Sequence, residues 1–400
     1  MKKLVFLCLD GLSWNVIDEM ISRGELKHIK KLINEGASGV LRAGFPMISP
    51  KIWASIFTGK SSSKHGILDF WSRREDLRAK QIWKVLHEEG IKLGVYRPIV
   101  CWDVLHVDGF FIPGISRIEL ETYPESLSHV LKKHEDDREK HDMGTLEGNY
   151  SSKENDFSFH SNHFLSLIEK YEPDFSLFYD ITCDTVSHFF WKRNMLNAGD
   201  FGFVQRIYER IDEFIRRIIE YADSRGSHVL VLSDHGFKGI SGLDTGKKVF
   251  TIKIPGLLRT LGISECVYGS HFDVSTIFRV KPGVSSSIDD LKEKFNSLIY
   301  DGDNLFELKE QGTQLIVRIK DYHVLDEKTH VKLPSGDLID VNQVINFNTR
   351  VTGTHCENNG VFIMNGPKIK EKANLNDLKP VDVFPLILDL MDIQISIENS

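Results

Sequence analysis

Short apolar segments of strand length recur along this chain, and helical patterns separate them. The five clearest strand candidates are Leu4–Leu9, Lys92–Val100, Phe175–Ile181, His228–Leu232 and Gly360–Met364. Between the third and the fourth, apolar residues repeat with the period of an α-helix from about Phe201 to Ala222. Strands that alternate with helices favour a mostly parallel sheet with helices on both faces. The sequence therefore predicts an α/β fold, which a last helix at about Pro380–Met391 closes.

Two regions depart from this alternation. Residues 102–160 are polar and rich in charge, and we interpret them as a surface insertion. Residues 245–348 contain short strand-like segments and one helix, and we interpret them as a smaller α+β cap inserted into the main domain. The predicted core then consists of residues 1–244 and 349–400.

The composition of the chain indicates which classes of binding partner and which cellular compartment to expect. The 50 basic and 57 acidic residues give a net charge of −7, so nothing favours a nucleic acid polymer or an anionic membrane surface. No segment approaches the roughly 18 apolar residues of a membrane helix. The five cysteines are scattered without a C-x-x-C spacing, which suits a reducing compartment. We therefore expect a cytoplasmic protein, and its oligomeric state stays open.

A serine stands directly before a proline at the start of a predicted helix that ends near Thr58-Gly59. Proline is favoured at the first helical position, so we predict that Ser49 is the N-cap residue and that Pro50 begins the helix. Free N–H groups and the positive end of the helix dipole favour an anion at such a place. The Ser49 hydroxyl is therefore either a simple cap or a nucleophile, and this segment alone does not decide between them.

Acidic residues and histidines gather where the predicted strands end. Six of them lie near strand ends, namely Asp10, Asp184, His188, Asp234, His235 and His355. Ligands of open α/β sheets bind at the carboxyl ends of the strands. Each residue alone has an ordinary explanation as a cap or a satisfied polar group. Together they predict a metal site, because carboxylates and imidazoles are typical ligands and Asp184 and His188 share one helix face.

In these residues the chain resembles the alkaline phosphatase superfamily, in the branch of type I phosphodiesterases and nucleotide pyrophosphatases. The matching motifs follow the order of the family: Leu9-Asp10-Gly11-Leu12, Ser49 through Thr58-Gly59 to His65-Gly66-Ile67, Asp184-x-x-x-His188, Ser233-Asp234-His235-Gly236, and Gly353-Thr354-His355 leading into Gly360–Gly366. The resemblance implies an alkaline phosphatase-like core sheet. It also implies a metal-dependent hydrolase that acts on phosphoric ester bonds.

The resemblance further implies two metal sites and a nucleophile. One site would comprise Asp184, His188 and His355, and the other Asp10, Asp234 and His235, with Ser49 bridging towards it. Zn²⁺ is the expected ion and Mn²⁺ is possible, because both suit imidazole and carboxylate ligands. Ser49 would form a phosphoserine intermediate, and His65 would be structural.

The substrate is less closely defined, because the chain departs from the family pattern after the nucleophile. The family usually has threonine followed by Phe-Pro-Asn, whereas this chain has Ser49-Pro50-Lys51-Ile52. Lys51 is a candidate substrate contact in place of the asparagine, or an ordinary surface lysine. We expect a small-molecule phosphate ester, first a phosphodiester or a nucleotide-type pyrophosphate and second a phosphomonoester. A non-catalytic interaction module braced by metals is the alternative from a different class.

The predicted cap is expected to contact the ester group that is not transferred. The cap lies in the sequence between the Asp234-His235 pair and His355, so its two ends must emerge beside the predicted metals. A segment placed in this way can close over a substrate. Its aromatic and basic candidates for that contact are Phe272, Arg279 and Lys320.

Overall fold

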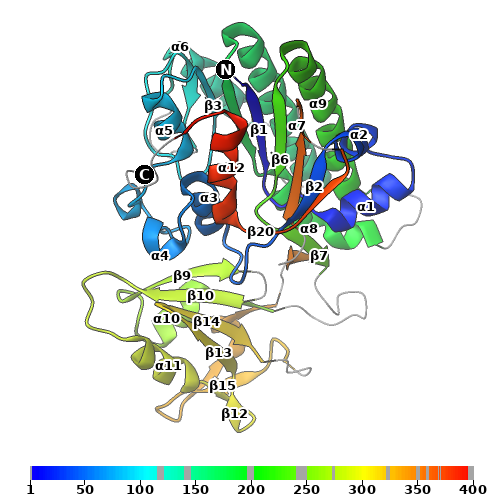
Figure 1. Cartoon of the computed structure of the whole chain (residues 1–400). Helices are drawn as coiled ribbons and strands as arrows, with labels where there is room; N and C mark the ends of the chain where they lie inside the picture. Colours follow the sequence, from blue (N-terminus) through cyan, green and yellow to red (C-terminus); the bar gives the residue numbers. More distant parts are fainter. Residues whose placement is uncertain are drawn as a thin grey trace. The chain divides into compact units, whose positions relative to one another are not determined.

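A computed structural model of the chain divides it into two compact units (Figure 1). Unit 1 comprises Met1–Lys238 and His355–Ser400, and unit 2 comprises Gly239–Thr354. The structure describes residues 2–114, 121–138, 146–195, 202–239, 250–272, 275–320, 325–347, 352–356, 360–367, 369 and 371–394. The predicted domain boundaries, at residues 244/245 and 348/349, lie outside the described residues.

An eight-stranded sheet forms the centre of unit 1. Its strand order is β20-β2-β19-β6-β1-β5-β3-β4. The strands are β1 Leu4–Leu9, β2 Ala37–Leu41, β3 Leu93–Tyr96, β4 Gly109–Ile112, β5 Phe175–Asp180, β6 His228–Leu232, β19 Gly360–Asn365 and β20 Ala373–Leu378. Only β19 runs antiparallel to its neighbours, β2 and β6, and the other pairings in this sheet are parallel. The predicted α/β class with a mostly parallel sheet is confirmed.

Every residue of the central strand β1 is buried, so the sheet is covered on both faces. The helices of unit 1 are α1 Trp14–Ser22, α2 Lys27–Glu35, α3 Ser49–Thr58, α4 Ser62–His65, α5 Ile82–Glu88, α6 Ser126–Arg138, α7 Leu146–Tyr171, α8 Thr182–Met195, α9 Phe203–Arg225 and α12 Val383–Leu390. Side chains from α7, α8 and α9 share one core cluster with alternate residues of β1. Figure 1 shows α3 and α12 together, and these two helices are in contact.

The interpretation of residues 102–160 as a surface insertion is wrong for the part that the structure describes. Residues Gly109–Ile112 form the edge strand β4 of the main sheet, and all four are buried. Tyr150 and Phe157 on α7 belong to the core of unit 1. The many serine, asparagine and charged residues of α7 hid this apolar face, because Tyr150 and Phe157 are the buried apolar residues of its described part before residue 160 and lie seven positions apart. Residues 115–120 and 139–145 lie outside the described residues.

Unit 2 has its own α+β structure and its own apolar core. One sheet has the order β13-β14-β10-β9, a second has β12-β11-β15-β16, and β17 pairs with β8. The elements are β8 Thr251–Ile252, α10 Ile254–Thr260, β9 Val267–Phe272, β10 Ser275–Val280, α11 Ile288–Asn296, β11 Ile299–Tyr300, β12 Asp303–Asn304, β13 Phe306–Gln311, β14 Gln314–Ile319, β15 His330–Lys332, β16 Leu338–Asp340 and β17 Ile345–Asn346. Leu291 and Phe295 of α11 and Val317 of β14 belong to this core.

The basic residues predicted to contact substrate from this region have partners inside unit 2. The Arg279 guanidinium lies over the Tyr268 ring at 5.5 Å, and the Lys320 ammonium pairs with Asp303 at 2.7 Å. The side chain of Phe272 is outside the described part of the chain. A role of these residues in substrate binding stays a prediction. Among the described helices of both units, none is long and apolar enough to cross a membrane.

The corrected interpretation of residues 102–160 predicts how two neighbouring substitutions on α6 affect stability. Leu131 is 3% exposed and belongs to the core, whereas Val130 is 43% exposed. We expect Leu131→Ala to lower the free energy of unfolding by about 2 to 5 kcal/mol, because it leaves a cavity. Val130→Ala should change it by less than about 0.5 kcal/mol.

Urea unfolding followed by tryptophan fluorescence measures this difference. All six tryptophans of the chain precede residue 239, so the signal reports on unit 1. Equal unfolding midpoints for the two variants would contradict the assignment of α6 to the core.

Candidate metal centre and nucleophile

Asp10 lies at the carboxyl end of β1 with its side chain fully buried. Its Oδ2 accepts hydrogen bonds from the Tyr179 hydroxyl at 2.7 Å and from the Trp53 indole N–H at 2.9 Å. These two donors fix the carboxylate and leave Oδ1 directed at the hydroxyl of Ser49. Burial raises the pKa of Asp10 well above its usual value, and the charges of Asp234 and Asp184 raise it further.

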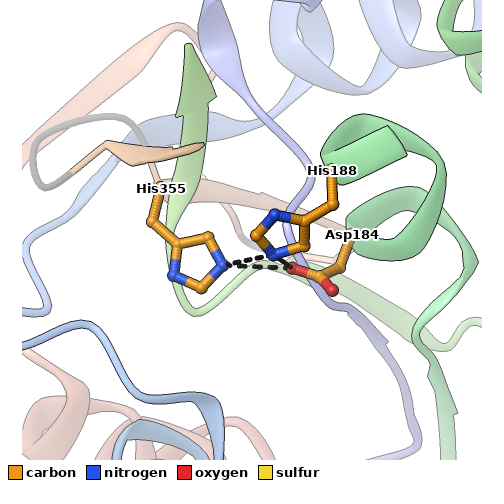
Figure 2. A group of neighbouring side chains, drawn as sticks. All are labelled: Asp184, His188 and His355. Carbon is orange, nitrogen blue, oxygen red and sulfur yellow. Dashed lines mark hydrogen bonds and ion pairs between the residues drawn. The ribbon is translucent and has the colours of Figure 1, made fainter. Parts of the chain in front are cut away.

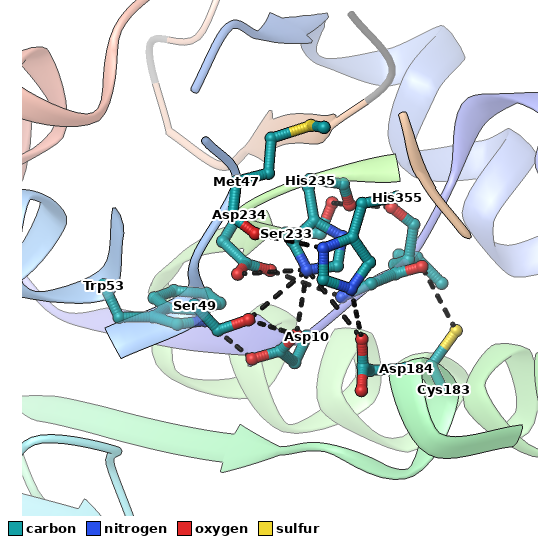
Figure 3. A network of polar contacts seen from close by, with 12 residues as sticks. Asp10, Met47, Ser49, Trp53, Cys183, Asp184, Ser233, Asp234, His235 and His355 are labelled. Atoms are coloured by element: carbon teal, nitrogen blue, oxygen red, sulfur yellow. Dashed lines mark hydrogen bonds and ion pairs between the residues drawn. The ribbon is translucent and has the colours of Figure 1, made fainter. Parts of the chain in front are cut away.

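Three side-chain atoms, from Ser49, Asp234 and His235, converge beside Asp10 (Figure 3). Ser49 Oγ lies 3.4 Å from Asp10 Oδ1 and 3.3 Å from His235 Nε2. His235 Nε2 lies 3.6 Å from Asp10 Oδ1 and 3.4 Å from Asp234 Oδ2. The Nδ1 of His235 faces the carbonyl of Gly236 at 3.2 Å. A carbonyl only accepts, so Nδ1 carries the proton and the Nε2 lone pair points into the cluster.

A second group adjoins the first and consists of Asp184, His188 and His355 (Figure 2). Asp184 and His188 lie one turn apart on α8, and their Oδ1 and Nε2 atoms are 3.5 Å apart. His355 lies on β18, Gly353–Cys356, which pairs with β7, Gly236–Gly239. Its Nε2 lies 3.3 Å from Asp184 Oδ1 and 3.0 Å from His188 Nε2.

The His355 ring has the orientation of a metal-binding imidazole. Its Nδ1 faces the Met47 carbonyl at 3.0 Å and therefore donates to it, which leaves Nε2 without a proton. A backbone carbonyl that holds the second nitrogen is typical of histidine ligands. The two groups are also neighbours, because His235 Nε2 lies 3.8 Å from Asp184 Oδ1.

The distances within each group match those between ligands of one ion. Zn²⁺ with bonds of about 2.0–2.1 Å in tetrahedral geometry places its ligand atoms roughly 3.3 Å apart. The measured separations run from 3.0 to 3.6 Å. Two groups of side chains thus have the donor types and the spacing to hold one divalent ion each.

The electrostatics of the cluster support a cation between these ligands. Asp184 Oδ1 and Asp234 Oδ2 are buried, and neither accepts a hydrogen bond of good geometry. Burial and then the charge of Asp184 raise the pKa of Asp234 to about 6. Burial and then the neighbouring His355 lower the pKa of His235 well below its usual value, so His235 is neutral. A divalent ion would satisfy the orphaned oxygens and the neutral imidazole together.

The position of Ser49 differs by one residue from the prediction. Ile48 is the N-cap residue, with extended backbone, and Ser49 is the first residue of α3. The hydroxyl of Ser49 faces Asp10 and His235. The helix ends as predicted at Gly59, whose φ of 64° is the left-handed conformation that favours glycine.

His65 and Lys51 have local partners. The Ile67 N–H donates to His65 Nδ1 at 3.0 Å, so the other ring nitrogen donates to Ser55 Oγ at 3.0 Å. Burial lowers the pKa of His65 to about 4, and this neutral ring ties α3 to the following turn. The Lys51 ammonium contacts the Pro46 carbonyl at 3.3 Å, and burial lowers its pKa. Its contact with substrate stays a prediction.

Three groups that position the site were not predicted from the sequence. Trp53 and Tyr179 hold Asp10, and the Met47 carbonyl orients His355. Trp53 lies four residues after Ser49, so helical spacing could have indicated it. Tyr179 lies in a strand that is buried throughout, where no alternation marks one face. A backbone carbonyl has no sequence signal at all.

A family model for type I phosphodiesterases/nucleotide pyrophosphatases matches residues 4–339. The chain belongs to this family. As a type I phosphodiesterase/nucleotide pyrophosphatase it is a hydrolase that acts on phosphoric ester bonds, and the family is metal-dependent. The matched span contains Asp10, Ser49 and the Asp234-His235 pair, and it ends before His355. Among curated protein sequences, none is significantly similar to this chain.

Solved structures of the same family share the fold at low sequence identity. Human ectonucleotide pyrophosphatase/phosphodiesterase 5 has a TM-score of 0.59 at 12% identity, covering 99% of this chain and 96% of its own. An inactive variant of the murine protein in complex with AMP has a TM-score of 0.60 at 12% identity, covering 98% and 96%. The α/β fold of the chain is therefore that of the alkaline phosphatase superfamily.

The two ligand groups predict the metal content of the protein. Wild-type protein should contain two divalent ions, and His188→Ala and His235→Ala should each reduce this number, as measured by elemental analysis. Removing the ions with a chelator should lower the thermal midpoint by at least about 5 °C, because the buried carboxylates lose their counter-charge.

His330→Ala is the matched control for these variants. His330 also faces a carboxylate, with Nε2 3.1 Å from Asp340 Oδ1, but this pair is exposed in unit 2. That variant should keep both ions. An ion content far below two in active wild-type protein would exclude the two-site arrangement.

Proposed function

We propose that this chain hydrolyses a phosphodiester or a nucleotide-type pyrophosphate bond through a covalent phosphoserine intermediate on Ser49. The observation that carries the proposal is the position of the Ser49 hydroxyl. It lies 3.4 Å from Asp10 Oδ1 and 3.3 Å from His235 Nε2, within one candidate metal group and beside the other. A serine that only capped a helix would instead bond to an amide of its own first turn.

The chain supplies a nucleophile that is held in place. Ser49 Oγ would attack phosphorus, forming the Oγ–P bond while the P–O bond to the leaving group breaks. Water would then attack phosphorus, release the phosphate product and restore the Ser49 hydroxyl. Because Ser49 is the first residue of α3, the phosphoryl group would lie beside the start of this helix, whose positive end would favour the charge that develops.

Two ions fit the ligands, with Zn²⁺ as our first choice and Mn²⁺ as the alternative. Asp184, His188 and His355 would hold one, and Asp10, Asp234, His235 and Ser49 the other. When bound, such ions supply Lewis-acid stabilisation of the phosphoryl oxygens and lower the pKa of the serine hydroxyl. Trp53 and Tyr179 keep Asp10 oriented by bonding to its second oxygen.

A small-molecule ester of nucleotide size is the proposed substrate. The family description names phosphodiesters and nucleotide pyrophosphates, and one structural relative binds AMP. A phosphomonoester is the second candidate. We also propose that the enzyme acts in the cytoplasm, because all five cysteines are free and three of them are buried. Cell fractionation with an antibody to the chain tests that location.

Substitution of the proposed nucleophile should separate catalysis from folding. Ser49→Ala should lower turnover about a thousandfold or more while keeping the metals and the unfolding midpoint. Ser49→Thr should retain part of the turnover. Ser55→Ala is the matched control on the same helix, since the Ser55 hydroxyl bonds to the Lys51 carbonyl and to His65, and it should remain active.

Acid quenching of the reaction should trap the substrate's phosphoryl moiety on the Ser49 peptide, as detected by mass spectrometry. Near wild-type turnover in Ser49→Ala would show that water attacks directly and would exclude the covalent intermediate. Rates on bis-aryl and mono-aryl phosphates with added Zn²⁺ or Mn²⁺ then decide between the diester and the monoester.

A further inference from the structure

A cavity of about 240 Å³ lies entirely within unit 1, and Tyr179 is one of its lining residues. Tyr179 lines this cavity and also donates a hydrogen bond to Asp10, so the cavity is separated from the metal centre by one side chain. Its rim includes three large apolar side chains with unusual exposure, Phe70 at 58%, Trp102 at 37% and Ile181 at 36%. Apolar surface of this kind commonly marks a binding site.

One cation, Arg97, lines this apolar cavity. No carboxylate of the described residues lies within ion-pair distance of its guanidinium. Asp180 also lines the cavity: its Oδ1 accepts the amide N–H of Thr182 at 2.8 Å at the start of α8, and the charge of Arg97 acts on this carboxyl without forming an ion pair with it. A guanidinium has five N–H donors, and the contact described for this one is made by Nη1 alone. Arg97 thus retains donors for a ligand in the cavity.

A chain of hydrogen bonds through His160, Tyr96 and His163 positions the Arg97 side chain. Its Nη1 donates to Nε2 of His160 on α7. The Nδ1 of His160 must then carry the proton, and it lies 2.9 Å from the Tyr96 hydroxyl oxygen. The Tyr96 hydroxyl in turn lies 3.2 Å from Nδ1 of His163, to which it donates. Burial lowers the pKa of His163 to about 4, which keeps that nitrogen an acceptor.

The backbone that carries Arg97 is strained and firmly anchored. Arg97 and Val100 both have a φ of 56°, a conformation that is costly for residues other than glycine and most of all for a branched side chain. The Arg97 backbone amide donates to the Ile112 carbonyl at 2.7 Å, and the Gln81 side-chain amide donates to the Val100 carbonyl at 2.6 Å. Strain that the surrounding structure enforces in this way is characteristic of functional sites.

We propose that this cavity binds an organic group of the phosphate ester and that Arg97 selects an anionic substituent on that group, with His160 as its positioning residue. This inference rests on the proposed function, because it assigns a specificity site to the same reaction. The apolar rim would cover the flat or aliphatic part of the group, and the guanidinium would bind its carboxylate or phosphate. It also places a determinant of specificity in unit 1, outside the predicted cap.

Two diesters of equal size test the selection of charge. Both release para-nitrophenol, and the second ester group is para-carboxyphenyl in one and the neutral para-carbamoylphenyl in the other. Wild-type enzyme should show a kcat/KM about tenfold or more higher for the anionic ester, since a charge-assisted hydrogen bond is worth at least that ratio. The difference in kcat/KM between the two esters should come from a lower KM for the anionic ester.

Substitutions test which residues cause the preference for the anionic ester. Arg97→Gln should reduce the ratio of kcat/KM between the anionic and the neutral ester to about one, and Arg97→Lys should keep part of the preference. His160→Leu should raise KM for the anionic ester only, an effect that a general loss of stability would not produce. Arg216→Gln is the control for charge, because Arg216 lies on α9 and pairs with Glu213 and Glu220, and it should keep the full preference.

Binding to a variant without turnover separates this inference from the proposed function. Ser49→Ala should bind the anionic diester about tenfold more tightly than the neutral one by calorimetry, and the added substitution Arg97→Gln should remove the difference. Equal affinities, or a preference that survives Arg97→Gln, would overturn the inference. Absence of hydrolysis of both diesters by wild-type enzyme would overturn the proposed function, while the binding ratio would still decide on Arg97.

Discussion

Three buried carboxylates share the carboxyl edge of the sheet, and their mutual repulsion determines what else must surround them. Asp10 and Asp234 are fully buried, and Asp184 is nearly so. Two like charges about 4 Å apart repel each other by roughly 4 kcal/mol even at an effective dielectric constant near 20. The indole and hydroxyl donors on Asp10 and the three imidazoles reduce this cost without removing it. Divalent cations would complete the compensation, and the stability of unit 1 would then depend on metal binding.

The register of the parallel strands is what brings these carboxylates together. In the paired strands β1, β5 and β6, Leu9 lies opposite Asp180, and Cys8 lies opposite Leu232. The residues that follow each strand therefore emerge side by side at one edge. Gly11, with a φ of 70°, allows α8 to approach closely, because a Cβ there would lie 2.8 Å from the Asp184 Cα. The strand register thus determines which residues lie at this edge of the sheet, and their side chains then complete the ligand groups.

The parts that could be predicted from the sequence are those with local periodicity or motif spacing. The strand His228–Leu232 and the helix α9 follow directly from their apolar patterns. The edge strand β4 was missed, because four residues are too few to show a period. The predicted strand over Lys92–Val100 ends at Tyr96, since Arg97 turns to positive φ before a proline. Tertiary contacts decide such features, and they also place Tyr179 on Asp10 and His160 on Arg97.

Because His355 follows unit 2 in the sequence, the two ligand groups are completed at different stages of synthesis. Asp10, Asp234 and His235 all precede unit 2, so a nascent chain contains this group before the first residue of unit 2 is made. The group of Asp184, His188 and His355 is complete only after all of unit 2 has been synthesised. An ion at that group would join the parts of the chain that precede and follow unit 2. It would thereby close a long loop, and its binding free energy would stabilise the last strands of unit 1.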